Sequence, residues 1–116
     1  GTAAGLPGRA LLACCEAAGV APREATAHLG PCIRPCCYEV GPEVARQFPA
    51  AVGRVVEGRH RLDLAAAARL QLLDTGVPPE AVFDTAACTC CEPGWYFSHR
   101  RDGSRYGRHW ALVAMS

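Results

Sequence analysis

The segment Leu29–Gly41 constrains the fold of this chain more than any other. It places three cysteines, two prolines, an aromatic residue and a carboxylate within one short stretch. Proline fixes the backbone angle φ at Pro31 and Pro35 and biases the preceding residues toward extended geometry, while Gly30 and Gly41 permit sharp turns. The stretch fits neither a helix interior nor a regular strand. It therefore predicts a rigid connection between elements that holds its side chains in place.

Helix-start and helix-stop residues predict three helices. Pro7 is tolerated in a first helical turn, and apolar residues on one face follow it until Gly19. A Gly-Pro pair starts a short second helix that a further proline ends. Asp63 is a good N-cap, and Gly76 closes the last helix. The expected helices are Pro7–Ala18, a short one from Pro42 to Phe48, and one from Asp63 to about Thr75.

Short apolar runs bounded by turn residues predict five strands. Helices and strands that alternate predict an α/β fold with mixed strand order, in one domain over residues 1–116. The helix that follows Asp63 is apolar on nearly every side, which favours burial on more than one face and hence a missing partner. The expected strands are Ala25–Leu29, Arg54–Glu57, Ala81–Asp84, Trp95–Ser98 and Arg108–Met115, the last two around a turn at Asp102-Gly103.

Composition counts against binding to nucleic acid or to an acidic membrane, and against membrane insertion or export. The formal net charge is +1, with the basic residues spread along the chain, so there is no electrostatic footprint for nucleic acid or an acidic membrane. No run of about 20 apolar residues and no signal peptide is present, which predicts neither a membrane span nor export. The eight cysteines lie largely in adjacent pairs, whose side chains diverge and rarely bridge. These features favour reduced thiols in the cytoplasm.

The clustered cysteines allow three interpretations. Cys88 and Cys91 have a Cys-x-x-Cys spacing, and Cys32, Cys36 and Cys37 offer thiolates elsewhere, so two loops can close a tetrahedral zinc site. Prolines stiffen the first of these loops, which counts against such a site. The favoured interpretation is therefore free, buried cysteines that behave as small hydrophobic residues, with zinc and a disulfide left open.

A compact basic turn is the first candidate binding element. Arg100 and Arg101 stand next to Asp102, and a guanidinium binds phosphate through a fixed two-pronged fork. The alternative is a solvated hairpin end in which Asp102 pairs with an arginine, which contributes little to stability.

Glu39, at the end of the rigid bend, is the second candidate. Its carboxylate can accept hydrogen bonds from ribose hydroxyls or position an arginine, and the alternative, a cap on the helix at Pro42, is favoured. The histidines form no pair that would share an ion, and none is assigned a catalytic role. No residue of the chain is predicted to be catalytic or to bind a metal.

Three motifs also occur together in one known family. They are the Leu29–Gly41 string, Cys88-Thr89-x-Cys91, and Phe97-Ser98-x-Arg100-Arg101-Asp102-Gly103, with Leu62-Asp63-Leu64 opening a helix between the first two. In this order they resemble the YfiH/laccase-domain family, multifunctional purine nucleoside enzymes once described as polyphenol oxidases. The resemblance runs from Gly1 to about Val113. It implies a layered α/β/β/α sandwich with mixed sheets, of which this chain is roughly the C-terminal half.

The resemblance implies a cytoplasmic zinc enzyme, with copper also reported for the family. Its members cleave adenosine, inosine or methylthioadenosine with phosphate and deaminate adenosine. Their zinc ligands, His, Cys and His, would lie N-terminal to Gly1, so we expect the chain to be inactive alone and to need that half or a homo-oligomer. Purine nucleoside and phosphate would be bound with the help of Glu39, Arg100 and Arg101. Two alternatives stay open: a cysteine-rich zinc-binding module, and a non-catalytic domain that interacts through an open sheet edge.

Overall fold

The computed structural model describes residues 2–105 and 107–112. The α-helices are α1 (Leu6–Ala18), α2 (Pro42–Ala45), α3 (Leu64–Thr75) and α4 (His99–Asp102). The strands are β1 (Ala27–Leu29), β2 (Glu39–Val40), β3 (Gly53–Val56), β4 (Arg59–Leu62) and β5 (Val82–Asp84). Short 3-10 turns lie at Thr2–Ala4, Pro22–Glu24, Ala50–Val52 and Pro79–Ala81.

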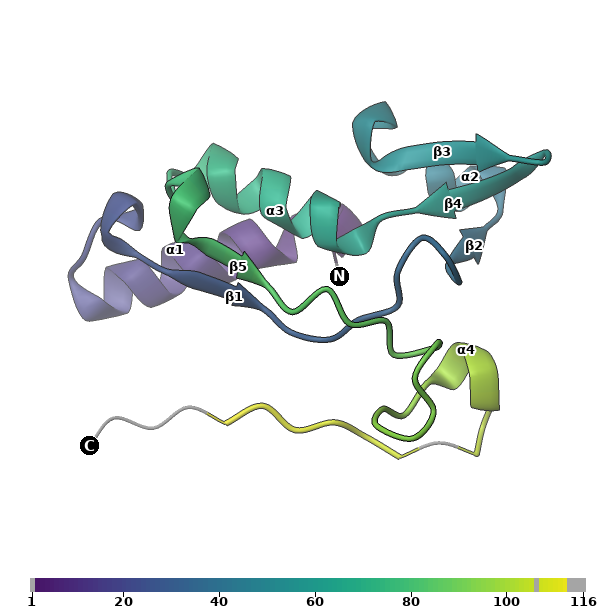
Figure 1. Ribbon diagram of the computed structural model, residues 1–116. Helices are drawn as coiled ribbons and strands as arrows, with labels where there is room; N and C mark the ends of the chain where they lie inside the picture. Colours follow the sequence, from purple (N-terminus) through teal and green to yellow (C-terminus); the bar gives the residue numbers. More distant parts are fainter. Residues whose placement is uncertain (1, 106, 113–116) are drawn as a thin grey trace.

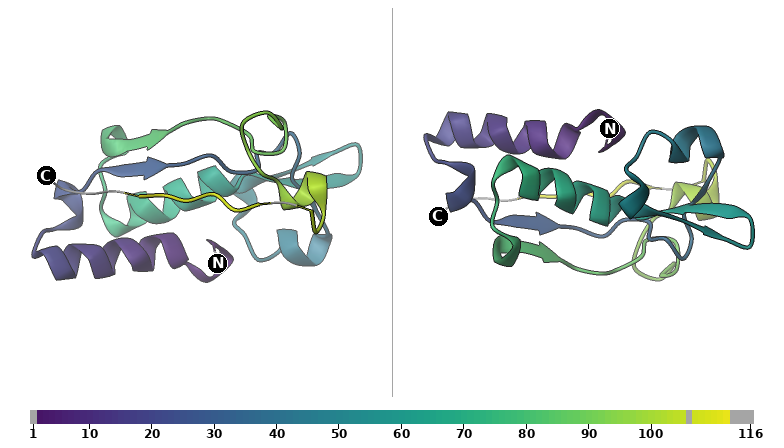
Figure 2. Two further views of the ribbon diagram at one scale, coloured as in Figure 1. Left: turned by 90° about the horizontal axis from the view of Figure 1, so that it is seen from below. Right: turned by 90° about the horizontal axis from the view of Figure 1, so that it is seen from above.

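The strands form two small sheets, one parallel and one antiparallel. Strands β1 and β5 pair in parallel, whereas β2, β4 and β3 pair in antiparallel fashion in that order. Helices α1 and α3 lie side by side and cover one face of the β1–β5 pair (Figures 1 and 2). The second sheet lies beyond the N-terminal end of α3 (Figure 1). The predicted mixed α/β fold is therefore confirmed.

The core forms between the two long helices and the parallel strand pair. Leu72 of α3, Val77 and Val82 of β5 are buried together, and partly buried residues of α1 and β1 pack against them. Gly8 lets the helices approach closely, since a Cβ there would lie 3.0 Å from Oγ1 of Thr75. Helix α3 thus packs against both α1 and the sheet. Elements of this chain therefore bury two of its faces, whereas its apolar pattern in the sequence predicts a missing partner for that burial.

The helix ends follow the local signals in the sequence. Gly19 ends α1 with φ of 68°, in the left-handed region that glycine adopts at low cost. The Asp63 carboxylate accepts a hydrogen bond of 2.9 Å from the backbone N–H of Ala66 at the start of α3. Helix α2 ends at Ala45 and is shorter than predicted. No helix in the described part of the chain is long and apolar enough to cross a membrane.

Replacing Asp63 with alanine tests the cap of α3. We expect Asp63→Ala to lower the free energy of unfolding by about 1 kcal/mol, because an N–H at the helix start loses its acceptor. Urea denaturation measures the change. Asp63→Asn keeps a capping oxygen and should retain most of the stability. Equal losses in both variants would show that the carboxylate acts in some way other than capping.

The C-terminal strand prediction is wrong for the described residues. Trp95 ends a turn, the residues from Tyr96 to Ser98 lead into α4 without regular structure, and residues 107–112 form no strand; the rest of the predicted strand, 113–115, lies outside the described residues. A strand needs a paired neighbour, and here Trp95 is 82% exposed and Trp110 95% exposed. Strand β4, by contrast, was not predicted, because a charged run precedes its buried Leu62.

Candidate functional site

The proline-rich bend and the arginine turn meet at one surface depression. Its volume is about 420 Å³. The bend contributes one wall and the start of α4 contributes the other, while His109 reaches it from the C-terminal segment. The lining residues are Pro31, Cys32, Ile33, Tyr38, Thr89, Phe97, Ser98, His99, Arg100 and His109. The two motifs that the sequence singled out are therefore brought together by the fold.

Arg100 lies at the junction of two depressions. Its Nη1 donates a hydrogen bond of 2.8 Å to the carbonyl oxygen of Glu39, and its guanidinium lies 5.2 Å from the centre of the Tyr38 ring. A cation over an aromatic face is held by the ring quadrupole. Arg100 also lines a second depression with Glu39 and Arg59. One cationic side chain thus borders an aromatic surface on one side and a charged surface on the other.

Arg101 is fully engaged with the protein. Its guanidinium forms a two-pronged ion pair with Asp102, at 2.9 and 2.7 Å. The remaining donors reach backbone carbonyl oxygens of Thr89 and Cys90 and of Tyr96, at 3.0, 3.2 and 2.9 Å. Arg101 therefore ties α4 to the loop that carries the second cysteine motif.

Glu39 pairs with an arginine and does not cap a helix. Its carboxylate lies 3.5 Å from Nη1 of Arg59, with both side chains largely exposed. Helix α2 begins after Gly41 without a side-chain capping hydrogen bond. The favoured alternative, that Glu39 caps the helix at Pro42, is therefore wrong in this structure, whereas its carbonyl does hold Arg100.

Two histidines border the aromatic depression. Nε2 of His109 accepts a hydrogen bond of 2.9 Å from the backbone N–H of Phe97, and the two rings lie 5.5 Å apart. His99 precedes Arg100 on the same wall. Because His99 is adjacent to the candidate Arg100 in the sequence, its place at the depression could have been predicted. His109 gave no such signal, because its contact depends on how the C-terminal segment folds back.

Arg34 joins the bend to the segment that follows β5. Its guanidinium donates two hydrogen bonds to the Asp84 carboxylate, at 2.7 and 2.6 Å, and its Nε donates one to the carbonyl oxygen of Ala87 at 3.0 Å. This hydrogen bonding to Arg34 holds the pKa of Asp84 below its usual value. The pair fixes the bend against the loop that carries Cys88.

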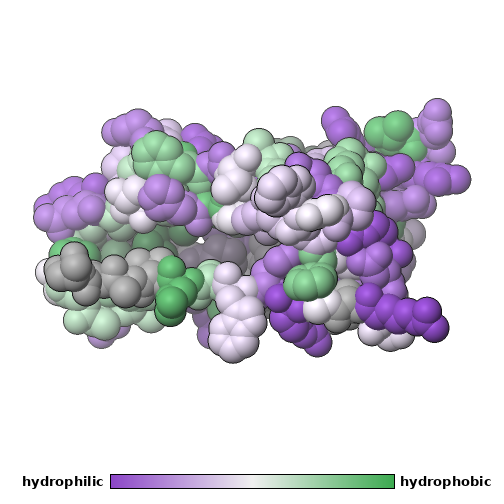
Figure 3. All heavy atoms as spheres, turned by 60° about the horizontal axis from the view of Figure 1, so that its bottom comes forward, coloured by the Kyte–Doolittle hydropathy of each residue, from purple (hydrophilic) through white to green (hydrophobic). Residues whose placement is uncertain are grey.

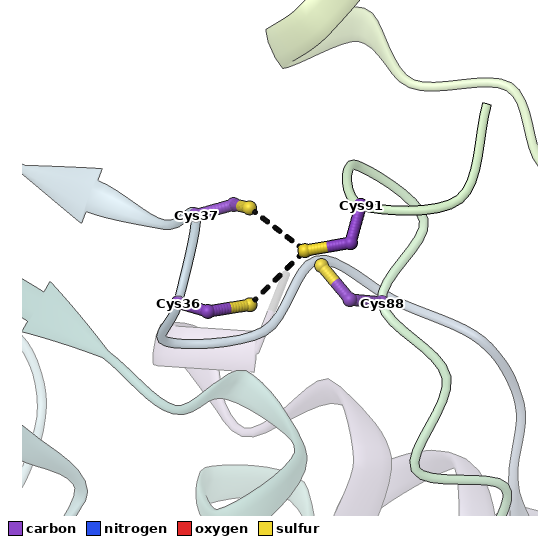
Figure 4. A group of neighbouring side chains, drawn as sticks. All are labelled: Cys36, Cys37, Cys88 and Cys91. Atoms are coloured by element: carbon purple, nitrogen blue, oxygen red, sulfur yellow. Dashed lines mark hydrogen bonds between the residues drawn. The ribbon is translucent and has the colours of Figure 1, made fainter.

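Four cysteines from the two motifs form one cluster. Cys36 and Cys37 of the bend face Cys88 and Cys91 of the following loop, and all four sulfur atoms lie within 4.8 Å of one another. Sγ of Cys91 lies 3.3 Å from that of Cys37 and 3.5 Å from that of Cys36. Figure 4 shows Cys91 pointing between the two bend cysteines, with Cys88 beside it. Sequence reasoning raised this zinc-like arrangement and favoured buried, separate thiols, yet Cys36 and Cys91 are exposed.

The cluster cysteines differ in their acidity. Burial and a hydrogen bond with Cys91 raise the pKa of Cys36 to about 11, and the contact with Cys91 also raises that of Cys37. Burial acts to raise the pKa of Cys88 as well. Backbone N–H donors, that of Arg34 foremost, outweigh burial there and lower the pKa to about 6. Of Cys36, Cys37 and Cys88, only Cys88 has a lowered pKa.

The side chains that could hold a metal in the described residues are not the two histidines and one cysteine that the family resemblance implies for the catalytic zinc. Within residues 2–105 and 107–112, the side chains close enough to share an ion are those of Cys36, Cys37, Cys88 and Cys91. Two histidines and a cysteine are not gathered anywhere in that part of the chain. No catalytic step through a metal is therefore assigned to these residues.

Known proteins match both the sequence and the structure. A family model described as multi-copper polyphenol oxidoreductase laccase matches residues 1–116. Purine nucleoside phosphorylase YlmD of Geobacillus stearothermophilus is 36% identical over 97% of this chain and 44% of its own length. Adenosine deaminase RL5, from an unknown prokaryotic organism, is 37% identical over 71% of this chain and 34% of its own.

A solved structure gives the same result for the fold. The crystal structure of Bacillus licheniformis hypothetical protein YfiH superposes with a TM-score of 0.79 at 30% identity, over 87% of this chain and 41% of that one. The mixed α/β fold of this chain, with its parallel and antiparallel sheets, is therefore that of the solved structure over most of the chain. The chain spans less than half the length of each of these three proteins.

Proposed function

The chain belongs to the multi-copper polyphenol oxidoreductase laccase family, and we propose that it forms part of a purine nucleoside phosphorylase that also deaminates adenosine. The observation that carries the proposal is the convergence of the bend and the arginine turn on one depression. The names of the relatives, a purine nucleoside phosphorylase and an adenosine deaminase, supply the class of substrate. Adenosine, inosine and methylthioadenosine are the substrates proposed.

The depression offers the surfaces that a nucleoside and phosphate require. A purine is a flat aromatic group, and the rings of Tyr38 and Phe97 provide apolar faces beside it. Phosphate is an anion that a guanidinium binds strongly. Arg100 borders the aromatic depression and the charged one next to it, so we assign the phosphate contact to Arg100.

Phosphorolysis places the heaviest demand on the position of the anion. A phosphate oxygen forms a bond to the anomeric carbon of ribose while the bond from that carbon to the purine nitrogen breaks, and the purine leaves with the electron pair and takes up a proton. Positive charge develops on the ribose as the bond breaks. A fixed anion next to that charge lowers the barrier, because the interaction strengthens in the transition state. Arg100 is held for this task by Tyr38 and the Glu39 carbonyl.

Glu39 and Arg101 enter the proposal as positioning residues. Glu39 holds Arg100 through its carbonyl, and its exposed carboxylate is available for ribose hydroxyls beside Arg59. Arg101 has its donors occupied by Asp102 and by backbone carbonyls, so we assign it the task of keeping α4 against the bend.

The remainder of the proposed domain supplies the zinc, or the copper reported for the family. The relatives extend well beyond the part matched here, and exposed apolar side chains favour a covering layer: Trp95, Phe83, Trp110 and Leu112 are half exposed or more. Figure 3 shows hydrophobic side chains exposed among polar ones on the face turned forward. We propose that the exposed apolar side chains pack against the N-terminal half of the domain or a second copy. Clustered free thiols favour a cytoplasmic protein.

A complementation assay tests the proposed function. The 116-residue chain and the N-terminal part of the Geobacillus relative are prepared separately and together. Adenine released from adenosine in the presence of phosphate, and ammonia, are then measured by chromatography and a coupled assay. We expect turnover only when both parts are present, because the walls of the pocket and the metal ligands are on different parts.

Two outcomes would contradict this function. Phosphorolysis by the chain alone would remove the claim that the site is divided between two parts. A stable mixed complex, seen by size-exclusion chromatography, that neither cleaves nor deaminates adenosine would remove the claim of nucleoside chemistry.

A further inference from the structure

We propose that Cys36, Cys37, Cys88 and Cys91 bind a structural zinc ion that fastens the bend to the following loop. Four sulfur atoms around zinc at about 2.3 Å would lie roughly 3.8 Å from one another in a tetrahedron. The four sulfur atoms here lie within 4.8 Å, with two separations of 3.3 and 3.5 Å. Side-chain rotations that lengthen the two shortest separations would bring the cluster to that geometry. The proposal does not rest on the proposed function.

Zinc fits the cluster better than other metals or a disulfide. A set of four soft thiolates in a tetrahedron selects zinc or iron. Zinc has no geometric preference of its own, so it tolerates ligands on the adjacent residues Cys36 and Cys37. A single disulfide would use two of the four sulfur atoms and leave two thiols pressed against it. Because Cys91 is nearly equidistant from both bend cysteines, the arrangement favours one shared ion.

The surroundings provide hydrogen bonds suited to a metal-bound sulfur. The backbone N–H of Arg34 donates to Sγ of Cys88 at 3.4 Å, and the Arg61 guanidinium donates to the carbonyl of Cys36 at 3.0 Å. Four thiolates on one divalent ion leave a net negative charge, and the Arg61 guanidinium places one positive charge beside it. Such outer contacts orient ligands and raise metal affinity.

The site is structural because every position on the ion is filled. A catalytic zinc keeps one position open for water or substrate, whereas four thiolates close it. The ion would be held by residues adjacent in sequence to the walls of the depression: Tyr38 follows Cys37, and Thr89, which follows Cys88, also lines it. The carbonyls of Thr89 and Cys90 bind Arg101. Zinc at this place would therefore fix both walls that hold Arg100 and Arg101.

Metal analysis of matched variants tests the proposal. The protein is purified under reducing conditions with zinc in the culture, and bound metals are measured by mass spectrometry. We expect Cys91→Ser to lose about one zinc per chain relative to the wild type. Cys14→Ser, an exposed cysteine on α1, should keep the wild-type content. Unchanged zinc in Cys91→Ser, or iron in place of zinc, would overturn the proposal.

Alkylation of the wild-type protein gives a second test that needs no variant to fold. Iodoacetamide should label Cys14 with or without a chelator, but Cys36 and Cys91 only after the chelator, because a bound zinc protects its ligands. Cobalt substitution of the wild-type protein should add thiolate-to-cobalt absorption, and the chelator should remove it. Labelling of Cys36 and Cys91 at the rate of Cys14 before chelation would disprove the site, as would a disulfide between cluster cysteines in protein purified under reducing conditions.

Discussion

Arg100→Ala is expected to lower kcat/KM for phosphorolysis of adenosine by roughly a hundredfold in the complemented enzyme, the loss typical when one preorganised charge partner of a transition state is removed. Arg100 is the cation that borders both depressions, and it is already fixed by Tyr38 and by the Glu39 carbonyl. The KM for phosphate should rise as well, because the anion loses the paired hydrogen bonds of the Arg100 guanidinium. Steady-state kinetics with varied phosphate measure both effects.

Deamination provides the internal control for Arg100. It consumes water and no phosphate, so Arg100→Ala should leave it within a few-fold of the wild type. Arg9→Ala, an exposed arginine on α1, should change neither reaction. Arg100→Lys should recover only part of the activity, since an ammonium lacks the planar two-pronged fork. If deamination falls as far as phosphorolysis, Arg100 supports the wall and does not bind phosphate.

Leu62→Ala is expected to lower the free energy of unfolding by about 3 kcal/mol, because a large buried side chain is replaced by a cavity. Leu62 ends β4 and is only 1% exposed. Its backbone N–H also bonds the carbonyl of Tyr38, at 3.2 Å, so it lies where the second sheet meets the bend. Chemical denaturation followed by circular dichroism measures the change.

Leu12→Ala is the matched control for Leu62. Leu12 is 51% exposed on α1, and its truncation should cost no more than about 0.5 kcal/mol. A comparable loss in the two variants would mean that burial of Leu62 is not what stabilises this junction. Metal content should be measured in both variants, since a loosened bend would also weaken the proposed zinc site.

Local signals predicted the main elements well. Asp63 capped α3, Gly19 ended α1, and the apolar runs at β1 and β5 formed strands near their predicted positions. Each of these features depends on residues within a few positions of one another, so the sequence carries the information directly. The mixed α/β class followed from their order, and the motifs in that order indicated the family.

The same local reasoning failed at the C-terminal segment. Trp95–Ser98 and the residues from Arg108 have the composition of strands, yet the described residues there form none. Whether an apolar run becomes a strand depends on a neighbour with unpaired backbone groups. Composition therefore predicted the tendency of the segment but not its partner.

Local sequence patterns predicted the proline-rich bend, the helix ends and the candidate residues Glu39, Arg100 and Arg101. The folded structure, in contrast, was needed to show that Arg101 donates its hydrogen bonds to protein acceptors while Arg100 borders two depressions. It also decided that Cys36 meets Cys91, which lies 55 positions away in the chain. The parallel pairing of β1 with β5 carries the two loops side by side. Contacts of this kind depend on strand pairing across the fold, and no spacing within either motif encodes them.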